Sequence, residues 1–364
     1  MEIGLWLRDF KDAIKKTKSV LKGVTFSPLK HLYVEGNIGD VRVVANNLES
    51  CVEVYIDGKS LPPGKVLIDT KTLFLIEKIK PKEAGLGNNW VKVSDGKIEC
   101  NNKVITYNLG DDDYTVEDYP PTIECKNLVI TAPADAFSEA FDVVYACDRS
   151  DCGRETFEGV CIDNEYFVAS DSYILAHRKF EYENKLSKPV IIPYKSVELL
   201  RILLKGFKDD VKCYVDDDVE HLCFELDNIK HTIRLTDKPY LKWRELVYPE
   251  PKTIVTINVK DVLDELKLLQ HIDKSTKYES GTVKLKAECG IMKASARSLE
   301  RSMTVDIPVL DQIGTDMDYE IYVDGGFLIR MLEQRKDETT IAFAGAEALV
   351  VVGGTDMVAP IKPD

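Results

Sequence analysis

The stretch "TIVTINVKDVLDELKLLQH", residues 253–271, decides the fold, because it joins an alternating apolar strand directly to an amphipathic helix. Val262 and Leu266 lie one helical turn apart and predict the buried face of that helix. The same pattern occurs as "LVITAPADAFSEAFDVVYA" at 128–146 and "LWLRDFKDAIKKTKSVLKG" at 5–23, with the pairs Phe137 and Phe141, and Phe10 and Ile14. The copies follow at intervals of about 125 residues, which predicts a threefold repeat.

A second strand-to-helix pattern recurs inside the same three repeats. It reads "VLIDTKTLFLIEKIK" at 66–80, "VIIPYKSVELLRILLK" at 190–205 and "YEIYVDGGFLIRMLEQR" at 319–335, with Leu73, Val197 and Leu328 in equivalent places. Between these helices apolar and polar residues alternate and turn signals follow, which is typical of antiparallel strands. We therefore predict an α+β protein of three repeated domains, each with two helices packed on antiparallel sheet.

Two linker-like segments mark the domain boundaries. Residues 109–124 are acidic and include prolines, and "YPEPKT" at 248–253 has two prolines in four residues. These segments predict domains at 1–122, 123–250 and 251–364. Each is long enough to form its own core.

The composition is that of a folded, soluble protein, with 44% hydrophobic and 30% charged residues among 364. Apolar runs fall short of the roughly 20 residues that span a bilayer. The start lacks the basic and apolar regions of a signal peptide, so we expect a cytoplasmic protein.

The nine cysteines are odd in number and include no CxxC pair, which argues against a disulfide framework or a zinc ribbon. Cys147, Cys152 and Cys161 have no suitably spaced histidine beside them. We therefore expect no metal and no other cofactor.

The cations gather on predicted helices, although the net charge is −14. The first helix carries five cations at three- to four-residue spacing on one stripe, whereas a solvated helix normally mixes signs. Weaker stripes occur on later helices, but the first helix of the second repeat carries acids. Such segregation suits contact with the phosphates of duplex DNA without sequence preference. The predicted DNA-facing residues are Arg8, Lys11, Lys15, Lys18, Lys22, Lys71, Lys78, Arg201, Lys205, Lys260, Lys267, Lys274, Arg330 and Arg335.

The stretch "VASDSYILAHRKF" at 168–180 places turn residues between two apolar runs. With the three repeats and the basic helices, it resembles the bacterial β sliding clamp, the processivity subunit of the replicative DNA polymerase. The family signature Ala-Thr-Asp-Gly-His-Arg-Leu-Ala corresponds to residues 169–176. Further segments that are similar to the family, in order along the chain, are "KPVIIPYKSVELLRIL" at 188–203, "YLKWRELVYP" at 240–249 and "MVAPIK" at 357–362.

The resemblance implies a head-to-tail homodimeric ring, half of it formed by each copy, that encircles duplex DNA and has no catalytic activity. It implies a clamp loader that opens the ring, and it implies that the replicative DNA polymerase and other proteins with clamp-binding motifs are tethered. Ring closure would use two edge strands, "NKVITYNL" at 102–109 with Val104, Ile105 and Tyr107, and "LLQHIDK" at 268–274 with Leu268 and Ile272.

The resemblance also implies an apolar groove in which partner peptides dock. Its residues, called the groove set below, are Phe157, Ser170, Ser172, Ile174, Leu175, Leu241, Leu246, Met357, Ala359, Pro360 and Ile361.

Several groove positions depart from the family pattern. Ser172, Tyr173 and Ile174 replace Gly-His-Arg, Leu241 replaces a proline, and Glu245 replaces a second arginine. Loss of a glycine reshapes the pocket, and loss of an arginine removes a polar contact. We therefore predict an altered peptide specificity, as in a divergent clamp from a phage or mobile element.

Three other functions stay open. A clamp-fold regulator or decoy would bind replication proteins without encircling DNA. An enzyme could use Asp171, Tyr173 and His177 for acid-base chemistry, but no phosphate loop, HExxH or GxSxG motif accompanies them. A small-ligand binding module could use the groove, but it gives the cationic helices no role.

Overall fold

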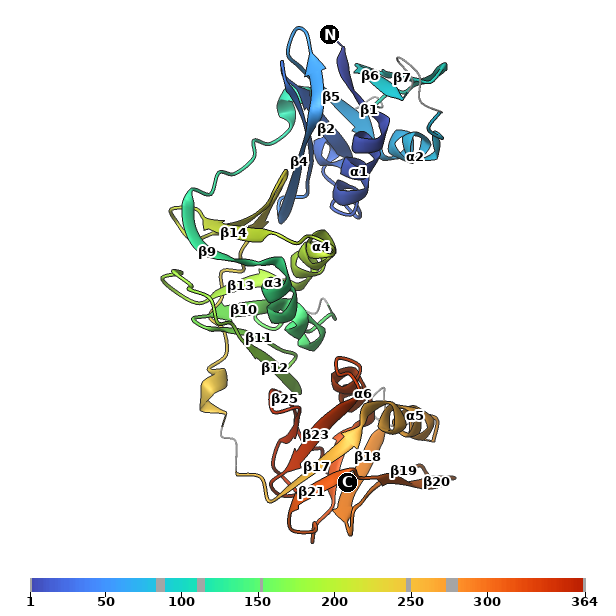
Figure 1. The fold of residues 1–364 in the computed structure, drawn as a ribbon, viewed down its shortest axis with the longest axis vertical. Helices are drawn as coiled ribbons and strands as arrows, with labels where there is room; N and C mark the ends of the chain where they lie inside the picture. Colours follow the sequence, from blue (N-terminus) through green and yellow to red (C-terminus); the bar gives the residue numbers. More distant parts are fainter. Residues whose placement is uncertain are drawn as a thin grey trace. The chain divides into compact units, whose positions relative to one another are not determined.

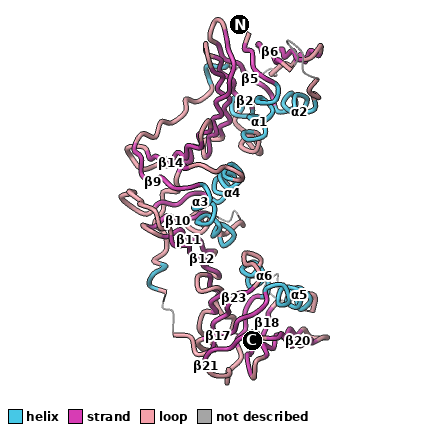
Figure 2. The backbone as a smooth tube through the Cα atoms, viewed as in Figure 1, coloured by secondary structure: helices cyan, strands magenta, loops and turns pink. Residues whose placement is uncertain are grey.

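The computed structural model describes residues 2–82, 89–109, 115–150, 153–246, 250–272 and 281–362. The chain divides into two compact units. Unit 1 comprises Met1–Ser138 and Glu181–Asp237, and unit 2 comprises Glu139–Phe180 and Lys238–Asp364. Both are α+β, as predicted, with helices beside antiparallel strands (Figures 1 and 2). The division into three domains at residues 122 and 250 stays a prediction.

The main sheet of unit 1 follows the order β8-β7-β6-β1-β4-β16-β15-β14-β9, and β2, β3 and β5 extend it beside β4. The helices of this part of the chain are α1 (Leu7–Thr17), α2 (Thr70–Lys78), α3 (Ala134–Ala140) and α4 (Tyr194–Leu204), with short 3₁₀ turns η1 (Ser27–Lys30) and η2 (Val116–Asp118). Its strands are β1 (Ile3–Trp6), β2 (His31–Gly36), β3 (Asp40–Asn46), β4 (Ser50–Ser60), β5 (Gly64–Asp69), β6 (Trp90–Ser94), β7 (Lys97–Cys100), β8 (Lys103–Thr106), β9 (Asn127–Pro133), β13 (Val190–Pro193), β14 (Asp210–Val215), β15 (His221–Leu226) and β16 (Ile229–Arg234).

Unit 2 contains strands in the order β10-β11-β12-β25-β24-β23-β17-β21, and a separate sheet in the order β20-β19-β18-β22. Its helices are α5 (Val259–Leu269) and α6 (Gly325–Leu332), with 3₁₀ turns η3 (Phe141–Ala146) and η4 (Trp243–Glu245). Its strands are β10 (Gly159–Asp163), β11 (Tyr166–Ser170), β12 (Ile174–Lys179), β17 (Thr253–Asn258), β18 (Thr282–Glu288), β19 (Ile291–Arg297), β20 (Ser302–Pro308), β21 (Asp311–Gly314), β22 (Ile321–Asp324), β23 (Glu338–Phe343), β24 (Val350–Val352) and β25 (Asp356–Val358).

All six predicted strand-to-helix junctions are confirmed: β1–α1, β5–α2, β9–α3, β13–α4, β17–α5 and β22–α6. Three of these helices begin after a capping side chain, because Asp69, Asn258 and Asp324 each accept two backbone N–H groups of the first turn. The side chains that mark the repeat, from Phe10 and Ile14 to Val262 and Leu266, are buried in the cores.

Two strand pairs join segments that the sequence assigned to different domains. In unit 1, β4 pairs with β16, and His231 Nε2 lies 2.5 Å from Ser50 Oγ. In unit 2, β12 pairs with β25, so that Leu175 lies opposite Met357. Each pair continues a sheet across a predicted domain boundary.

Two predictions about local structure are wrong. Helix α1 ends at Thr17, so Lys18 is its C-cap and Lys22 lies in the turns beyond, and the cationic stripe of the helix itself holds only three of the five residues. Leu268 lies in helix α5 and Ile272 in the turn that follows, so 268–272 is no edge strand. In that segment the helical spacing of Val262, Leu266 and Leu269 outweighs a short apolar run.

Candidate functional site

The exposed lysines of unit 1 form the first candidate surface. Lys15 on α1, Lys22 just beyond it and Lys71 on α2 are exposed, and their ammonium groups make no hydrogen bond or ion pair with another described residue. The two helices pack against each other, as Figure 1 shows. Their lysines are therefore available to an anionic partner.

Other cations of the predicted stripe are engaged within unit 1. Arg8 pairs with Asp9 at 2.9 Å, and Lys18 pairs with Glu77 at 2.6 Å. Lys11 donates to the carbonyl of Ile79, and Lys78 lies 5.0 Å from the ring centre of Phe74. Cations that are paired with a neighbouring carboxylate still contribute to a positive surface, but the net positive charge there is smaller than the sequence suggested.

The cations predicted on the later helices differ in exposure and pairing. Arg201 lies in the last turn of α4 and Lys205 is its C-cap. On α5, Lys260 is exposed, whereas Lys267 pairs with Glu333 at 2.8 Å. Lys274 lies outside the described residues.

Arg330 and Arg335 have partners other than phosphate. Arg335 follows the end of α6 and contacts the fully buried Asp356 at 2.7 Å, so its charge is matched by a carboxylate within unit 2. Arg330 lies on α6 and donates to Asp171 Oδ2 at 3.1 Å. These two guanidinium groups belong to the packing of unit 2, which helical spacing in the sequence could not reveal.

The turn before β12 forms the second candidate site. Asp171 Oδ1 accepts hydrogen bonds from the backbone N–H groups of Tyr173 and Ile174, each at 2.9 Å. Ser170 Oγ accepts from the Ser172 N–H at 3.1 Å and donates to the Ile174 carbonyl at 2.7 Å. Ser172 itself has φ of 79°, the left-handed region that favours glycine. The turn therefore keeps a backbone suited to glycine while carrying serine.

An apolar cluster lies beside this turn. Its buried members are Val168, Leu175, Trp243 and Met357, and the half-buried side chains packed on them are Tyr166, Tyr240, Leu241, Leu349 and Val351. The groove-set residues Leu175, Leu241 and Met357 are thus brought together. Trp243, Tyr240 and Tyr166 were missed, although "YLKW" at 240–243 carries the signal of closely spaced aromatic residues.

The remaining groove-set residues differ in burial and in their backbone hydrogen bonds. The Ala359 N–H donates to the Tyr173 carbonyl at 2.8 Å, and the Ile361 N–H donates to the Tyr322 carbonyl at 2.7 Å, which holds the tail that contains Pro360. Leu246 is exposed, Phe157 is half-buried, and Ser170 and Ile174 are buried. Leu175 and Met357 are floor residues, because both are almost fully buried.

Two arginines that the sequence reasoning missed contact the turn and the apolar cluster, respectively. Arg154 donates to Ser172 Oγ at 3.0 Å, pairs with Asp148 at 2.5 Å and lies over the Phe157 ring. Arg244 pairs with Asp163 and lies 4.6 Å from the centre of the Trp243 ring. Burial alone would raise the pKa of Asp148, but hydrogen bonds from Ser150 and the pairing with Arg154 hold it below its usual range.

Asp171 and His177 are engaged separately. Asp171 holds the turn and Arg330, whereas the His177 ring lies 5.3 Å from that of Trp243. Burial lowers the pKa of His177, so the neutral ring packs among aromatic side chains. Nothing in this arrangement aligns the two groups for a proton transfer.

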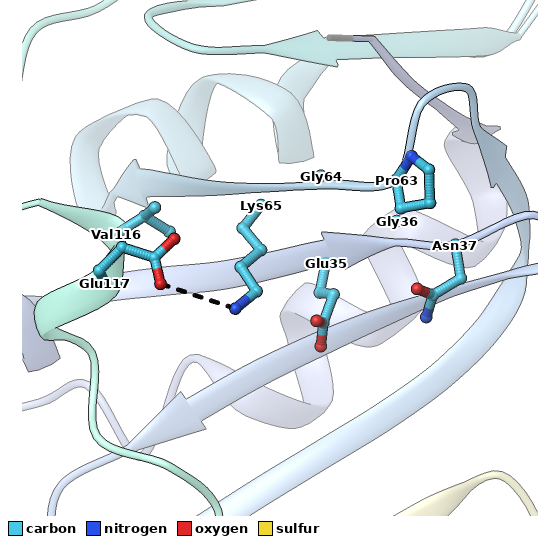
Figure 3. Close-up of a pocket in the computed structure, with 8 residues that line it drawn as sticks. All are labelled: Glu35, Gly36, Asn37, Pro63, Gly64, Lys65, Val116 and Glu117. Carbon is cyan, nitrogen blue, oxygen red and sulfur yellow. Dashed lines mark ion pairs between the residues drawn. The ribbon is translucent and has the colours of Figure 1, made fainter.

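A hollow of about 430 Å³ lies in unit 1, whereas the groove-set residues belong to unit 2. Figure 3 shows Glu35, Lys65 and Glu117 beside it, and the Lys65 ammonium is 3.9 Å from the Glu117 carboxylate. The charged lining differs from the apolar groove that a small-ligand module was expected to use.

Two kinds of feature are absent from the described residues, a membrane-spanning helix and a metal-binding cluster. None of the helices there is both long and apolar enough to cross a bilayer. No cluster of three or more His, Cys, Asp or Glu side chains suitable for a metal ion occurs in those same ranges. Cys152 lies outside them.

Solved structures of bacterial sliding clamps are similar to the whole chain. The β subunit of DNA polymerase III from Pseudomonas aeruginosa matches with a TM-score of 0.87 at 14% identity, covering 100% of both chains. The β subunit from Streptococcus pyogenes matches with a TM-score of 0.86 at 18% identity, and the sliding clamp from Bacillus subtilis with 0.86 at 17%, also over 100% of both chains. No family model matches the sequence. The chain therefore has the sliding-clamp fold, an α+β fold whose described residues include six α-helices beside antiparallel sheets.

Proposed function

We propose that this protein is a DNA sliding clamp, which encircles duplex DNA without sequence preference and tethers a replicative polymerase for processive synthesis. The observation that carries the proposal is the full-length match to bacterial clamps in fold, despite sequence identities of 14–19%. A fold this specific, built from the same repeated unit, supports the same use. The protein itself would catalyse no reaction, and a separate loader would open it.

The exposed lysines support the DNA contact. Lys15, Lys22, Lys71 and Lys260 can approach phosphates, while most of the acids among the described residues lie elsewhere, in strands and loops. Contacts made by flexible, hydrated ammonium groups are weak and carry no base information. A clamp needs such contacts, because strong ones would stop it from sliding.

Ring closure is proposed between edge strands of two copies. Strand β8 is the end strand of the unit 1 sheet, and Val104 on it is 59% exposed. Tyr107 follows β8, and its hydroxyl donates to the Leu67 carbonyl at 2.9 Å. The free edge of β20 in unit 2 is the partner we propose in place of 268–272, while exposed Leu268 on α5 can still pack beside the joint.

Retention on closed DNA tests the clamp function directly. The chain is incubated with nicked circular plasmid, loader and ATP, separated by gel filtration, and then treated with a restriction enzyme that linearises the plasmid. A clamp stays with the circle and is lost after linearisation, because only topology holds it. Equal loss from both forms would contradict the proposal.

A clamp-fold regulator is the second candidate. It is favoured by α3, whose exposed Asp135 and Glu139 would repel phosphates, and by the commitment of Arg330 and Arg335 to carboxylates. Such a protein would bind a polymerase peptide yet show no retention on circular plasmid. The same experiment, paired with a pull-down of polymerase, separates the two functions.

A further inference from the structure

Residues 115–122 of unit 1, called the strap below, lie against a small apolar cluster of the sheet. The residues of that cluster, called the socket below, are Leu29, Tyr33, Val44, Cys51 and Leu67. Tyr119 is the one buried residue between Thr115 and Leu128. Its ring stacks on that of Tyr33, with the ring centres 4.8 Å apart and 26° between the ring planes. A single aromatic side chain therefore anchors the strap in the socket.

The other attachments of the strap are weak. No backbone hydrogen bond joins it to the strands in the described part of the chain, and the bonds of its capping box join Thr115 to Asp118 within the strap. Arg42 donates to Thr122 Oγ1 at 3.3 Å, and the Lys65 ammonium lies 3.9 Å from the exposed Glu117 carboxylate. Exposed ion pairs contribute little to stability. A segment with so few buried contacts opens at a lower free energy than the sheet beneath it.

The Tyr119 hydroxyl opposes closure of the strap. It is buried, and it makes no hydrogen bond with another described residue. Water would satisfy the same hydroxyl once the strap is open, and a buried polar group without a partner costs free energy. The ring of Tyr119 therefore stabilises the closed strap, whereas its hydroxyl destabilises it.

The charges at the socket suit an aromatic ring that follows acidic residues. The strap itself reads "TVEDYPPT" at 115–122, so Glu117 and Asp118 precede its tyrosine. Lys65 borders the hollow beside η2, opposite Glu117 (Figure 3). Arg42 already pairs with two carboxylates, at 2.9 Å and 3.0 Å. Lys65 is therefore the cation that an acidic segment can meet at this site.

We propose that the strap opens and closes over the socket, and that the open socket binds an aromatic side chain from an acidic segment of another protein in place of Tyr119. The strap is then the chain's own ligand for this site. The socket lies in unit 1, whereas the groove set belongs to unit 2, so this site does not depend on the groove.

Alkylation of Cys51 by iodoacetamide measures the opening in the full-length protein, with mass spectrometry of the peptide that contains the thiol. Burial raises the pKa of the Cys51 thiol, and only the thiolate reacts, so the closed strap protects it. Tyr119→Ala should raise the labelling rate about tenfold, because the anchor is lost. Tyr119→Phe should lower the rate about threefold, because it removes the unpaired hydroxyl and keeps the ring.

Two controls separate strap opening from unfolding. Cys213 is fully buried on β14 and is reached only when the sheet unfolds, so its labelling should be slower than that of Cys51 in every variant. Tyr214→Phe changes a half-buried tyrosine of the same strand and should keep the wild-type rate at Cys51. Equal rates at Cys51 and Cys213, or no slowing in Tyr119→Phe, would overturn the opening of the strap and the site with it.

A peptide added to the protein tests the socket as a binding site. Acetylated and amidated TVEDYPPT at millimolar concentration should slow the labelling of Cys51 about twofold in the wild type and in Tyr119→Ala, because only the unoccupied open socket reacts. The peptide TVEDAPPT should leave both rates unchanged. Equal effects of the two peptides would overturn the binding of an aromatic side chain, while the rates of the variants alone would still support the opening.

Discussion

The two strand pairs that cross predicted domain boundaries differ in the buried polar side chains that stabilise them. At β4–β16 in unit 1, buried Ser50 and His231 form a neutral pair, and buried Glu53, which lies opposite Lys230, makes an ion pair with Arg42 at 3.0 Å. At β12–β25 in unit 2, fully buried Asp356 contacts Arg178 at 2.5 Å, Arg335 at 2.7 Å and the Tyr145 hydroxyl at 2.6 Å. The first junction has a neutral pair beside an ion pair, whereas the second gathers two guanidinium groups around one fully buried carboxylate.

The difference teaches how each junction can fail. Burial lowers the pKa of His231 to about 3, so the first junction is stable only while the ring stays neutral. The second depends on a complete set of partners, because a buried charge without its counterion costs several kcal/mol. Acidification and single substitutions therefore probe the two junctions separately.

The largest effect is expected from Asp356→Asn, which breaks the ionic junction. It leaves Arg178 and Arg335 buried without their shared carboxylate, and unit 2 should lose about 3–5 kcal/mol of unfolding free energy. Urea unfolding followed by fluorescence of Trp243, the one tryptophan in the sequence of unit 2, measures the loss. Asp311→Asn on exposed β21 is the matched control and should change the value by less than about 0.5 kcal/mol. A similar midpoint for both variants would mean that the buried network contributes little.

Acidification tests the neutral pair of Ser50 and His231 at β4–β16. The folded state holds the His231 pKa at about 3, below the unfolded value of about 6.5, so the unfolded state takes up the proton first. The stability contributed by neutral His231 is therefore complete above the unfolded pKa of about 6.5. As the pH falls below about 6 toward the folded pKa, this stability decreases by about 1.4 kcal/mol per pH unit. Urea unfolding at several pH values, followed by Trp6 and Trp90 fluorescence, should give a shallower pH slope in His231→Gln. His271→Gln, which changes an exposed histidine, should keep the wild-type slope.

A smaller effect is expected at the turn that leads into β12. Because Ser172 has φ of 79°, Ser172→Val forces a β-branched side chain into the left-handed region and should cost about 1–2 kcal/mol. Ser172→Gly relieves this strain but gains entropy in the unfolded chain, so its stability should stay within about 0.5 kcal/mol of the wild type. Thermal unfolding of the two variants side by side gives the difference. Equal stability would show that the turn adopts another backbone conformation.

The smallest effect on stability is expected from Lys15→Ala with Lys22→Ala, because neither ammonium group has a described partner. Unfolding free energy should change by less than about 0.5 kcal/mol. In a plot of the logarithm of duplex-DNA affinity against the logarithm of salt concentration, the slope should nevertheless become about 2 smaller in magnitude, since two phosphate contacts disappear. The control, Lys59→Ala with Lys212→Ala on strands β4 and β14, should leave the slope unchanged. An equal change in both double variants would argue against a helix-specific DNA surface.

Periodicity in the sequence predicted the fold well. The 3.6-residue spacing of Phe10 and Ile14, or Val262 and Leu266, appears in the chain regardless of what packs on it, and all six strand-to-helix junctions followed from such patterns. Helix ends were less predictable. The apolar Val20 and Leu21 extend the pattern of α1, yet the helix ends at Thr17 and both side chains are buried in turns.

The candidate sites were predicted in part. The resemblance pointed to the turn at 170–174 and to Leu175, Leu241 and Met357, which the fold does bring together. It missed Arg154 and Phe327, because contacts between residues so far apart in sequence leave no mark on local spacing. The three- to four-residue spacing of cations also predicted a DNA-facing Arg335, since spacing gives the side of a helix but not the residues that pack against it.

By itself, therefore, the sequence determined where strands run into helices, that this pattern repeats three times, and which helices carry cations, since these depend on residues close along the chain. Only the tertiary structure decided which of those cations stay free. Lys15 remains in solvent, whereas Arg330 and Arg335 meet Asp171 and Asp356 from segments of unit 2 distant in sequence or across a turn. The physical reason is that a charged side chain is free or neutralised according to which oppositely charged groups lie beside it in the folded chain. Those neighbours are set by how distant segments, including the strands, pair with one another.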